Sequence, residues 1–261
     1  MSSLRIFFRG GVTSYRALFG WLNPWIGVPM LVIAPLFQLL FFAYLGRATD
    51  VASDRYFVVG NGLLAAALPG LLGTGGSVNG ERSTKTLGML LSSPANRVAL
   101  FLGRTLPAIV NGFAVSAFCL VSGTLILDAH VPAAAVPGLA LTIVACAFSC
   151  SALGLCMGAF GLRARNVISF SWIFVPVLLL VSGANVPRDR LPDWLQAIGS
   201  GLPLTHGIAA ARDLVAGQAF PEIGRPLLLE LAVGLAYTGS GLLLLRLFEF
   251  ESRRTASLET M

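Results

Sequence analysis

Charged side chains are scarce in this sequence, since Asp, Glu, Lys and Arg together make up 11% of its 261 residues. Soluble domains carry about 25% charged residues. Hydrophobic residues reach 56%, and a soluble protein of that composition could not cover its surface with polar groups. The composition therefore excludes an ordinary soluble domain and predicts an all-α integral membrane protein, in which residues 1–261 form one transmembrane domain.

Histidine and cysteine are also rare, with two and four residues. Cys146 and Cys150 are one helical turn apart, but no His or acidic residue lies near them in sequence, so we expect them to pack rather than bind a metal. Ser200 and His206 are neighbours in sequence, whereas an intramembrane serine protease needs the two on different spans. We expect no catalytic and no metal site, and an intramembrane enzyme remains the weakest alternative.

The N-terminal segment 4–19 is amphipathic. Arg5, Arg9 and Arg16 lie within about 40° of one another on a helical wheel, and Phe8 belongs to the apolar face. Arg9 and Arg16 also interrupt any apolar run that a cleavable signal peptide would need. The pattern predicts a helix lying in the membrane interface, and the alternative is an unstructured basic tail that only sets topology.

Six apolar segments are long enough to cross a bilayer: 24–45, 56–78, 105–127, 137–162, 167–186 and 227–245. Gln38, Asn61 and Glu230 are the strongly polar residues that stand out within them. An intramembrane carboxylate such as Glu230 is a candidate functional group. The alternative is that Glu230 reaches the interface or pairs with Arg212 or Arg225.

The charges between these segments fall unevenly on the two sides of the predicted bundle. One side, with both termini, has twelve Lys or Arg and four acidic residues, a net charge of +8. The other has six Arg and seven acidic residues, a net charge of −1. The positive-inside rule predicts that both termini are cytoplasmic, in a multi-pass protein of the cell membrane. This orientation accounts for the net positive charge, so we expect no nucleic acid partner.

The cytoplasmic loop 80–97 is the densest polar stretch on that side. Leu87, Leu90 and Leu91 repeat at helical spacing and predict a short amphipathic helix, which Pro94 ends. Lys85 and the following Thr resemble a phosphate-binding loop, but the glycine needed directly before the lysine is absent. We therefore expect this chain to bind no ATP and no other cofactor itself.

The outer segment 187–225 is too polar to cross a membrane. Residues 191–198 and 205–215 predict two short helices, the second ended by Gly217. Such helices could re-enter the bundle, cap it or lie flat on it.

These patterns together resemble the membrane subunit of ABC-2 type exporters, the group that includes daunorubicin-type drug export permeases. The resemblance rests on the interfacial segment, the six spans and two motifs. The loop after the second span carries Glu81-Arg82-xxx-Thr86-Leu87-xx-Leu90-Leu91-Ser92-x-Pro94-xx-Arg97, and the outer segment carries Leu202-Pro203-Leu204-Thr205-His206. Lys85 and Gly88 stand where the family loop usually has Gly and Glu.

The resemblance implies a pore built from two permease subunits, as a homodimer or with a homologous partner. Two separate ATPase subunits, which bind ATP and Mg, would dock at a coupling helix formed by Glu81, Arg82, Lys85, Thr86, Leu87, Leu90, Leu91, Pro94 and Arg97. Segment 4–19, with Arg5, Phe8, Arg9 and Arg16, would be the adjoining elbow helix. Spans one, two and five would border the pathway, and the outer helices would close it. Candidate pathway or gate residues are Gln38, Asn61, Pro203, His206 and Glu230.

The sparse charge in the spans favours an amphiphilic substrate, such as a drug, lipid or peptide, moved outward. A secondary transporter or channel that works without an ATPase is the alternative. It would require intramembrane ion-coupling charges, and Glu230 is the candidate for that role.

Overall fold

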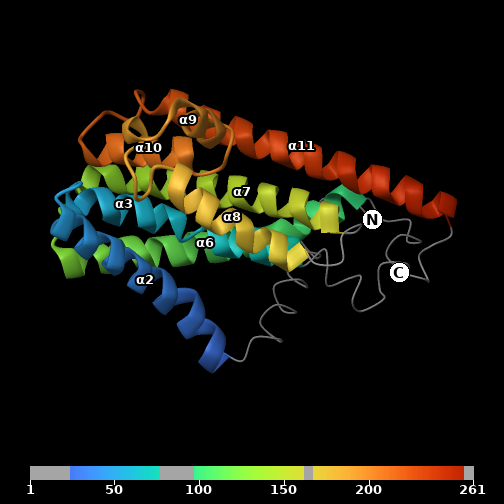
Figure 1. Ribbon diagram of the computed structural model, residues 1–261, viewed down its shortest axis with the longest axis horizontal. Coiled ribbons are helices and arrows are strands. Elements are labelled where there is room, and N and C mark those ends of the chain that lie inside the picture. Colours follow the sequence, from blue (N-terminus) through green and yellow to red (C-terminus); the bar gives the residue numbers. More distant parts are fainter. Residues whose placement is uncertain (1–23, 77–96, 162–166, 256–261) are drawn as a thin grey trace.

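The computed structural model describes residues 24–76, 97–161 and 167–255, and all regular secondary structure in these ranges is helical (Figure 1). Within them, five helical runs are long and apolar enough to cross a membrane. Four are the helices α2 (Pro24–Thr49), α6 (Arg97–Leu127), α7 (Val136–Gly161) and α11 (Gly224–Thr255). The fifth joins α3 (Asp54–Leu64) to the π-helical turn η1 (Pro69–Gly73).

The second predicted span is broken rather than one continuous α-helix. After Leu64 the backbone forms a tighter turn, in which the Ala66 N–H donates to the carbonyl of Leu63, three residues earlier, at 3.1 Å. The π-helical turn η1 then begins at Pro69. Proline supplies no N–H to an α-helical ladder, which accounts for a break at this point. Gly154 of α7 lies so close to the Gly70 carbonyl that a side chain there would collide with it. The irregular turn therefore lets α7 approach closely.

The fifth predicted span, 167–186, is too long. Helix α8 (Val167–Val181) ends five residues earlier, and it is apolar but shorter than the five spanning runs. The chain leaves the helix through a turn at Ser182–Asn185, in which Gly183 has a φ of 81°. Such a left-handed conformation is a common way for helices to end, and it favours glycine.

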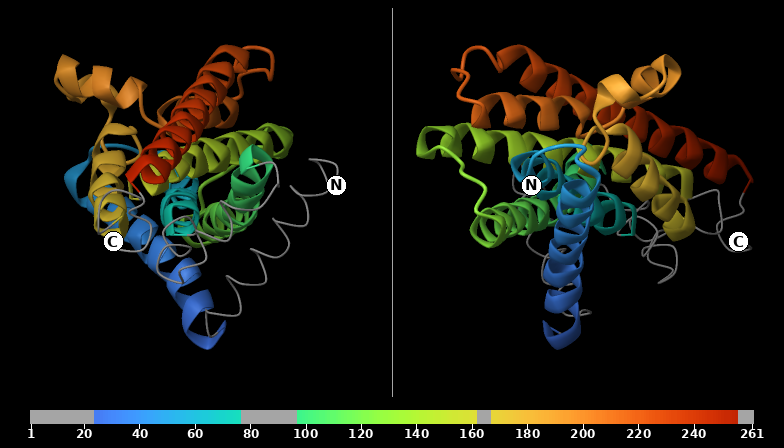
Figure 2. Two further views of the ribbon diagram at one scale, coloured as in Figure 1. Left: turned by 90° about the vertical axis from the view of Figure 1, so that its right-hand side faces the viewer. Right: turned by 60° about the vertical axis from the view of Figure 1, so that its left-hand side comes forward.

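Helices α3 and α7 form the inner layer of the bundle. In an apolar stretch of 18 residues within each spanning run, 83% of the residues are buried in the run that contains α3 and 72% in the run that contains α7. The corresponding shares are 22% for α2, 33% for α6 and 22% for α11. Helix α7 packs against α6, α11 and η1, while α3 packs against α2 and α6. The outer helices expose large apolar side chains, and α2 diverges from the bundle (Figures 1 and 2).

The segment before α11 contains the two predicted short helices. Helix α10 (Thr205–Val215) has the predicted bounds, and Gly217 follows it with a φ of 95°. Helix α9 (Asp193–Ser200) starts two residues later than predicted, after the short turn η3 (Arg188–Arg190) and Pro192. Helix α10 packs into the bundle against α3, α7 and α11, whereas α9 projects from it (Figure 2).

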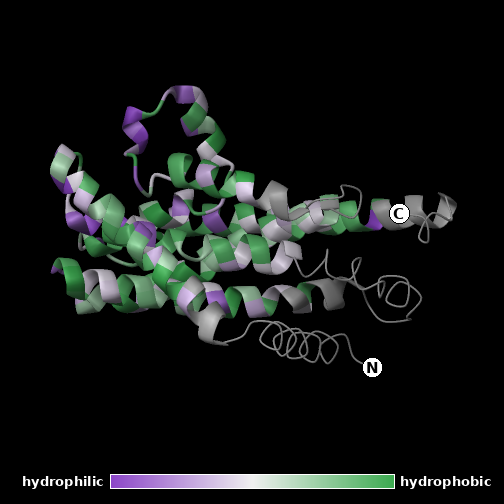
Figure 3. Ribbon diagram, turned by 60° about the horizontal axis from the view of Figure 1, so that its bottom comes forward, coloured by the Kyte–Doolittle hydropathy of each residue, from purple (hydrophilic) through white to green (hydrophobic). Residues whose placement is uncertain are grey.

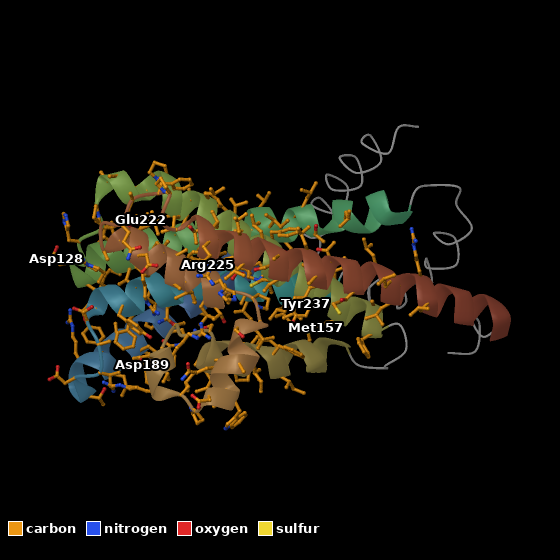
Figure 4. The ribbon with its side chains drawn as sticks, turned by 90° about the horizontal axis from the view of Figure 1, so that it is seen from above. Asp128, Met157, Asp189, Glu222, Arg225 and Tyr237 are labelled. Carbon is orange, nitrogen blue, oxygen red and sulfur yellow. The ribbon has the colours of Figure 1, made fainter. Side chains whose placement is uncertain are left out.

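Hydrophilic residues gather around these short helices and the neighbouring loops, while the long helices are mostly hydrophobic (Figure 3). Asp128, Asp189 and Glu222 all lie toward this end of the bundle (Figure 4). The end that carries α10 is therefore the place to look for polar chemistry among the described residues.

Candidate functional site

Most of the predicted partner-binding residues lie outside the described residues. This applies to the elbow-helix set Arg5, Phe8, Arg9 and Arg16, and to the coupling set Glu81, Arg82, Lys85, Thr86, Leu87, Leu90, Leu91 and Pro94. Arg97 is the residue at which α6 begins. The candidate pathway or gate residues Gln38, Asn61, Pro203, His206 and Glu230 are all described, and they fall around the two ends of α10.

Glu230 on α11 holds the start of α10. Its carboxylate has no exposed surface, and Oε1 accepts hydrogen bonds from the Leu204 N–H at 2.8 Å and from the Ser149 hydroxyl on α7. Oε2 accepts a hydrogen bond from the Gly207 N–H at 3.1 Å. The first N–H groups of a helix have no partner within the helix and carry a partial positive charge, so a buried carboxylate is well placed there.

The backbone at this helix start is unusual. Leu204 has a φ of 76°, a conformation that costs a non-glycine residue about 1–2 kcal/mol. Its side chain is fully buried, and the next residue, Thr205, donates from its hydroxyl to the Gly199 carbonyl at 2.6 Å. Burial of Leu204 and the bond from its N–H to Glu230 together hold the strained turn in place. Pro203 is part of the same buried turn.

Both predicted alternatives for Glu230 are wrong. The side chain does not reach the interface, since it is fully buried. It forms no ion pair with Arg212 or Arg225 in the part of the chain that the structure describes. Arg212 is instead bound at the other end of α10, and Glu230 is satisfied by one hydroxyl and two backbone N–H groups.

Arg212 joins the second half of α10 to α3 and to the turn after α8. Its guanidinium lies 3.5 Å from the centroid of the Tyr56 ring, within the range of a cation–π contact. Nη2 donates to the Gly183 carbonyl at 2.8 Å, the Ala184 carbonyl at 3.2 Å and the Tyr56 carbonyl at 3.3 Å. Burial lowers the pKa of Arg212 to about 10, which leaves it positively charged at neutral pH.

The close approach of these segments depends on a glycine of α3. A side chain at Gly60 would collide with the Ala184 carbonyl and would lie 2.9 Å from Arg212 Nη2. The Tyr56 hydroxyl, one turn earlier, donates to the Gly183 carbonyl at 2.7 Å. Three elements therefore meet at one buried point: α3, α10 and the turn that follows α8.

A chain of amides continues from this point towards α2. Asn61 on α3 donates to the Asn185 side-chain oxygen at 2.8 Å and to the Phe57 carbonyl at 3.1 Å. Gln38 on α2 approaches the Asn61 side-chain oxygen at 3.5 Å, at the long limit for a hydrogen bond. Gln38 and Asn61, two of the candidate pathway residues, thus lie near each other in a polar cluster bordered by α2, α3 and the end of α8.

His206 lies at the start of α10, but its partner is a backbone group. Its Nε2 is 2.9 Å from the Ser200 carbonyl oxygen, while the Ser200 hydroxyl donates to the Ala197 carbonyl at 2.6 Å. The two side chains therefore do not form the nucleophile–base pair that serine hydrolysis needs. Among the described residues, no group of three His, Cys, Asp or Glu is placed to hold a metal ion.

The family model of the ABC-2 type transporter matches residues 15–215. The chain belongs to this family. The matched range contains the predicted coupling segment 80–97, the amide chain of Asn61 and Asn185, and α10. The chain is thus a membrane protein of the ABC transporter class, as its motifs predicted.

Two curated relatives share similarity with much of the chain. The daunorubicin resistance ABC transporter permease protein DrrB1 of Streptomyces coeruleorubidus is 27% identical over 210 residues, which cover 78% of this chain and 74% of that protein. The probable multidrug ABC transporter permease YbhR of Escherichia coli K12 is 28% identical over 171 residues, which cover 63% of this chain and 44% of that protein. Both relatives are named as permeases.

Four residues of this polar core were not predicted as site residues: Ser149, Arg212, Tyr56 and Asn185. Ser149 and Asn185 occur in apolar predicted spans, where a buried amide or hydroxyl could have been noticed as a helix contact. Arg212 gave no such signal, because the outer segment contains several other arginines and acidic residues.

Proposed function

We propose that this chain is the membrane-spanning permease subunit of an ATP-driven exporter that moves an amphiphilic molecule outward. A separate ABC ATPase, docked at segment 80–97 on the cytoplasmic side, would hydrolyse the ATP. The observation that carries the proposal is the family match over residues 15–215, which includes that segment. The plasma membrane, with both termini in the cytoplasm, is the location that the charge distribution favours.

The permease would work as a pair, as a homodimer or with a homologous partner. Apolar side chains on α2 and α8 are exposed, among them Phe37, Phe41, Trp172 and Ile173. In a bilayer these faces can meet lipid or another helix bundle. The polar cluster of Gln38, Asn61 and Asn185 joins α2 to α3 and to the turn that follows α8. Two copies joined along α2 and α8 would place their polar clusters on a shared pathway.

The substrate class follows from the sparse charge of the spans and from the names of the relatives. Those names refer to daunorubicin resistance and to multidrug transport. A drug-like amphiphile can pass along an apolar pathway that offers a few polar contacts, such as the amides of Asn61 and Asn185. The α10 helix, with Pro203, His206 and Glu230 at its start, would close the outer end.

The geometry of Glu230 speaks against an ion-coupled secondary transporter. A coupling carboxylate must exchange its ion or proton with the pathway. Glu230 has no exposed surface, and its oxygens are occupied by Ser149, Leu204 and Gly207. This arrangement suits a structural anchor.

The proposal is tested by co-expressing the permease with a candidate ABC ATPase subunit from the same genome. The tagged full-length permease should co-purify with that ATPase, and Glu81→Ala and Leu87→Asp should each weaken the capture while the amount of folded permease in the membrane is unchanged. Asp128→Asn is the control, because Asp128 is exposed in the loop at the opposite end of α6 from segment 80–97. Equal capture by all variants would remove the coupling role of this loop, and no capture by the unmodified chain would remove the proposed partner.

A further inference from the structure

The turn that ends α8 brings two arginines together. Gly183, with its φ of 81°, is the centre of this turn. A side chain added at Gly183 would lie 3.1 Å from Cγ of Arg188 and 3.8 Å from Nη1 of Arg212. Arg188 comes from η3 and Arg212 from α10, so the aliphatic stem of one arginine and the guanidinium of another lie against one glycine.

Three N–H groups around this turn are buried without a hydrogen-bond partner among the described residues. They are Nδ2 of Asn185, Nε of Arg188 and Nε of Arg212. Asn185 is only 6% exposed, and its side-chain oxygen is already occupied by Asn61, so the unpartnered group is a donor. Buried polar groups in native proteins are nearly always hydrogen-bonded. These three unsatisfied donors belong to residues around the same turn, and they indicate that an acceptor would be stabilised there.

The charge of the site is also unbalanced. Neither Arg188 nor Arg212 forms an ion pair within the described ranges, although Asp189 and Asp213 follow them directly in the chain. Arg188 donates from Nη2 to the Gln196 carbonyl at 3.0 Å, and Arg212 donates only to carbonyls. A buried or half-buried cation without a counter-charge is costly, so an anion would be stabilised here.

We propose that Arg188, Arg212 and Asn185 form a binding site for the anionic head group of an amphiphile, a phosphate or a carboxylate. Guanidinium groups match the geometry of such anions, and the amide of Asn185 adds a neutral donor. Both arginines are half-buried, so they reach the surface while their Nε groups lie beneath it. Leu180, 41% exposed on the last turn of α8, offers the adjoining apolar surface for an acyl chain.

The site is tested by native mass spectrometry of the purified full-length permease in neutral detergent. Phosphatidylglycerol supplies an anionic head group with acyl chains, phosphatidylcholine supplies the same chains without net charge, and inorganic phosphate supplies the anion alone. The variants are Arg188→Gln, Arg188→Lys and the matched control Arg190→Gln. Arg190 belongs to the same short turn and is exposed.

We expect the permease to bind phosphatidylglycerol in preference to phosphatidylcholine. Arg188→Gln should weaken phosphatidylglycerol binding about tenfold, the size of one charge-assisted hydrogen bond, while Arg190→Gln leaves it unchanged. Arg188→Lys should retain part of the preference, which separates loss of charge from loss of fold. If inorganic phosphate displaces the lipid, the site takes the anion alone, and if it does not, the acyl chains are required.

Two results would overturn the site: no preference for phosphatidylglycerol in the unmodified permease, or equal loss in Arg188→Gln and Arg190→Gln. The measurement needs neither ATP nor the ATPase. The anion site can therefore fail while the exporter function stands, and the exporter function can fail while the site stands.

Discussion

The two ends of α10 are held by buried or half-buried charges of opposite sign, and the two anchors differ in completeness. At the start, the Glu230 carboxylate accepts hydrogen bonds from Ser149, Leu204 and Gly207 and is fully buried. Towards the end, Arg212 donates to three carbonyls from one nitrogen, stacks on Tyr56, and keeps an unpartnered Nε within the described residues.

This difference indicates which end of α10 can move. A buried group whose hydrogen bonds are all made is costly to displace, because several partners lose their bonds at once. Arg212 is half-buried and bonded to carbonyls of a turn, so it can exchange some of these contacts for others. We infer that the Glu230 end is a fixed anchor and the Arg212 end an adjustable one.

The largest expected effect comes from removing the fixed anchor. Glu230→Ala leaves two backbone N–H groups without an acceptor and removes one of the two acceptors of the Ser149 hydroxyl, which keeps the Cys146 carbonyl at 3.0 Å. The sum is on the order of 4 kcal/mol. For a chain of this size that lowers the thermal midpoint by about 10 °C. Differential scanning fluorimetry of the purified permease measures it. Glu230→Gln keeps one acceptor oxygen and should lose less, and equal losses in the two variants would show that the carboxylate is not the anchor.

A second, smaller effect should come from crowding the same anchor without removing it. A side chain at Gly207 would collide with the Cys146 sulfur on α7, and overpacking of this kind costs about 1–3 kcal/mol. Gly207→Ala should therefore lower the thermal midpoint, and Cys146→Ala in the same chain should restore most of the loss. Gly224→Ala is the control, since a side chain there meets nothing within 4 Å. Simple addition of the two single effects would contradict the packing of α10 on α7.

The adjustable anchor should respond less than the fixed one. Arg212→Lys keeps the positive charge but loses the planar group that stacks on Tyr56 and spans several carbonyls. We expect a loss of about 1–2 kcal/mol, with a midpoint shift clearly below that of Glu230→Ala. Amide hydrogen exchange should show faster opening in the second half of α10 and unchanged protection at its start. A loss as large as that of Glu230→Ala would remove the distinction between the two ends.

The smallest effect belongs to the exposed ion pair of Arg47 and Asp54. Arg47 Nη2 lies 2.7 Å from Asp54 Oδ2, across the loop that joins α2 to α3. Exposed pairs typically contribute about 0.2–1 kcal/mol, and this pair, joined by two hydrogen bonds, belongs at the upper end of that range. Arg47→Gln should therefore lower the thermal midpoint by about 3 °C at most. A large shift would mean that the α2–α3 loop is a third anchor of the bundle.

The local sequence pattern predicts the bounds of α10 correctly but places the end of α8 too late. The bounds of α10 follow from an apolar pattern ended by Gly217, and the structure has the same bounds. In α8, the apolar run continues to Val186, so hydropathy predicts five more helical residues than exist. The helix ends at Val181, Gly183 follows with a φ of 81°, and the carbonyls of Gly183 and Ala184 bond to Arg212, about thirty residues later in the chain. A glycine after a helix is a local signal, but the contact with Arg212 that holds this turn is not.

Polar residues of the candidate site could be predicted within apolar segments, where they stand out. They could not be predicted within the outer segment, where polar residues are common. Gln38, Asn61 and Glu230 stand out because they interrupt apolar helices. Asn61 and Glu230 form buried hydrogen bonds, and Gln38 approaches Asn61 in a partly buried contact. Arg212 could not be distinguished from the other arginines of the outer segment. The partners of Glu230 were missed for a related reason: two of its three donors are backbone N–H groups, which carry no sequence signal.

The most direct test of the proposed exporter function is transport by the reconstituted complex. The permease and the ABC ATPase subunit that co-purifies with it would be placed in vesicles with the cytoplasmic side outward. Uptake of a fluorescent amphiphile such as daunorubicin would then be followed. The account predicts uptake that requires ATP, the ATPase and an intact loop 80–97. Uptake of the same rate by the permease alone, without ATP, would contradict it.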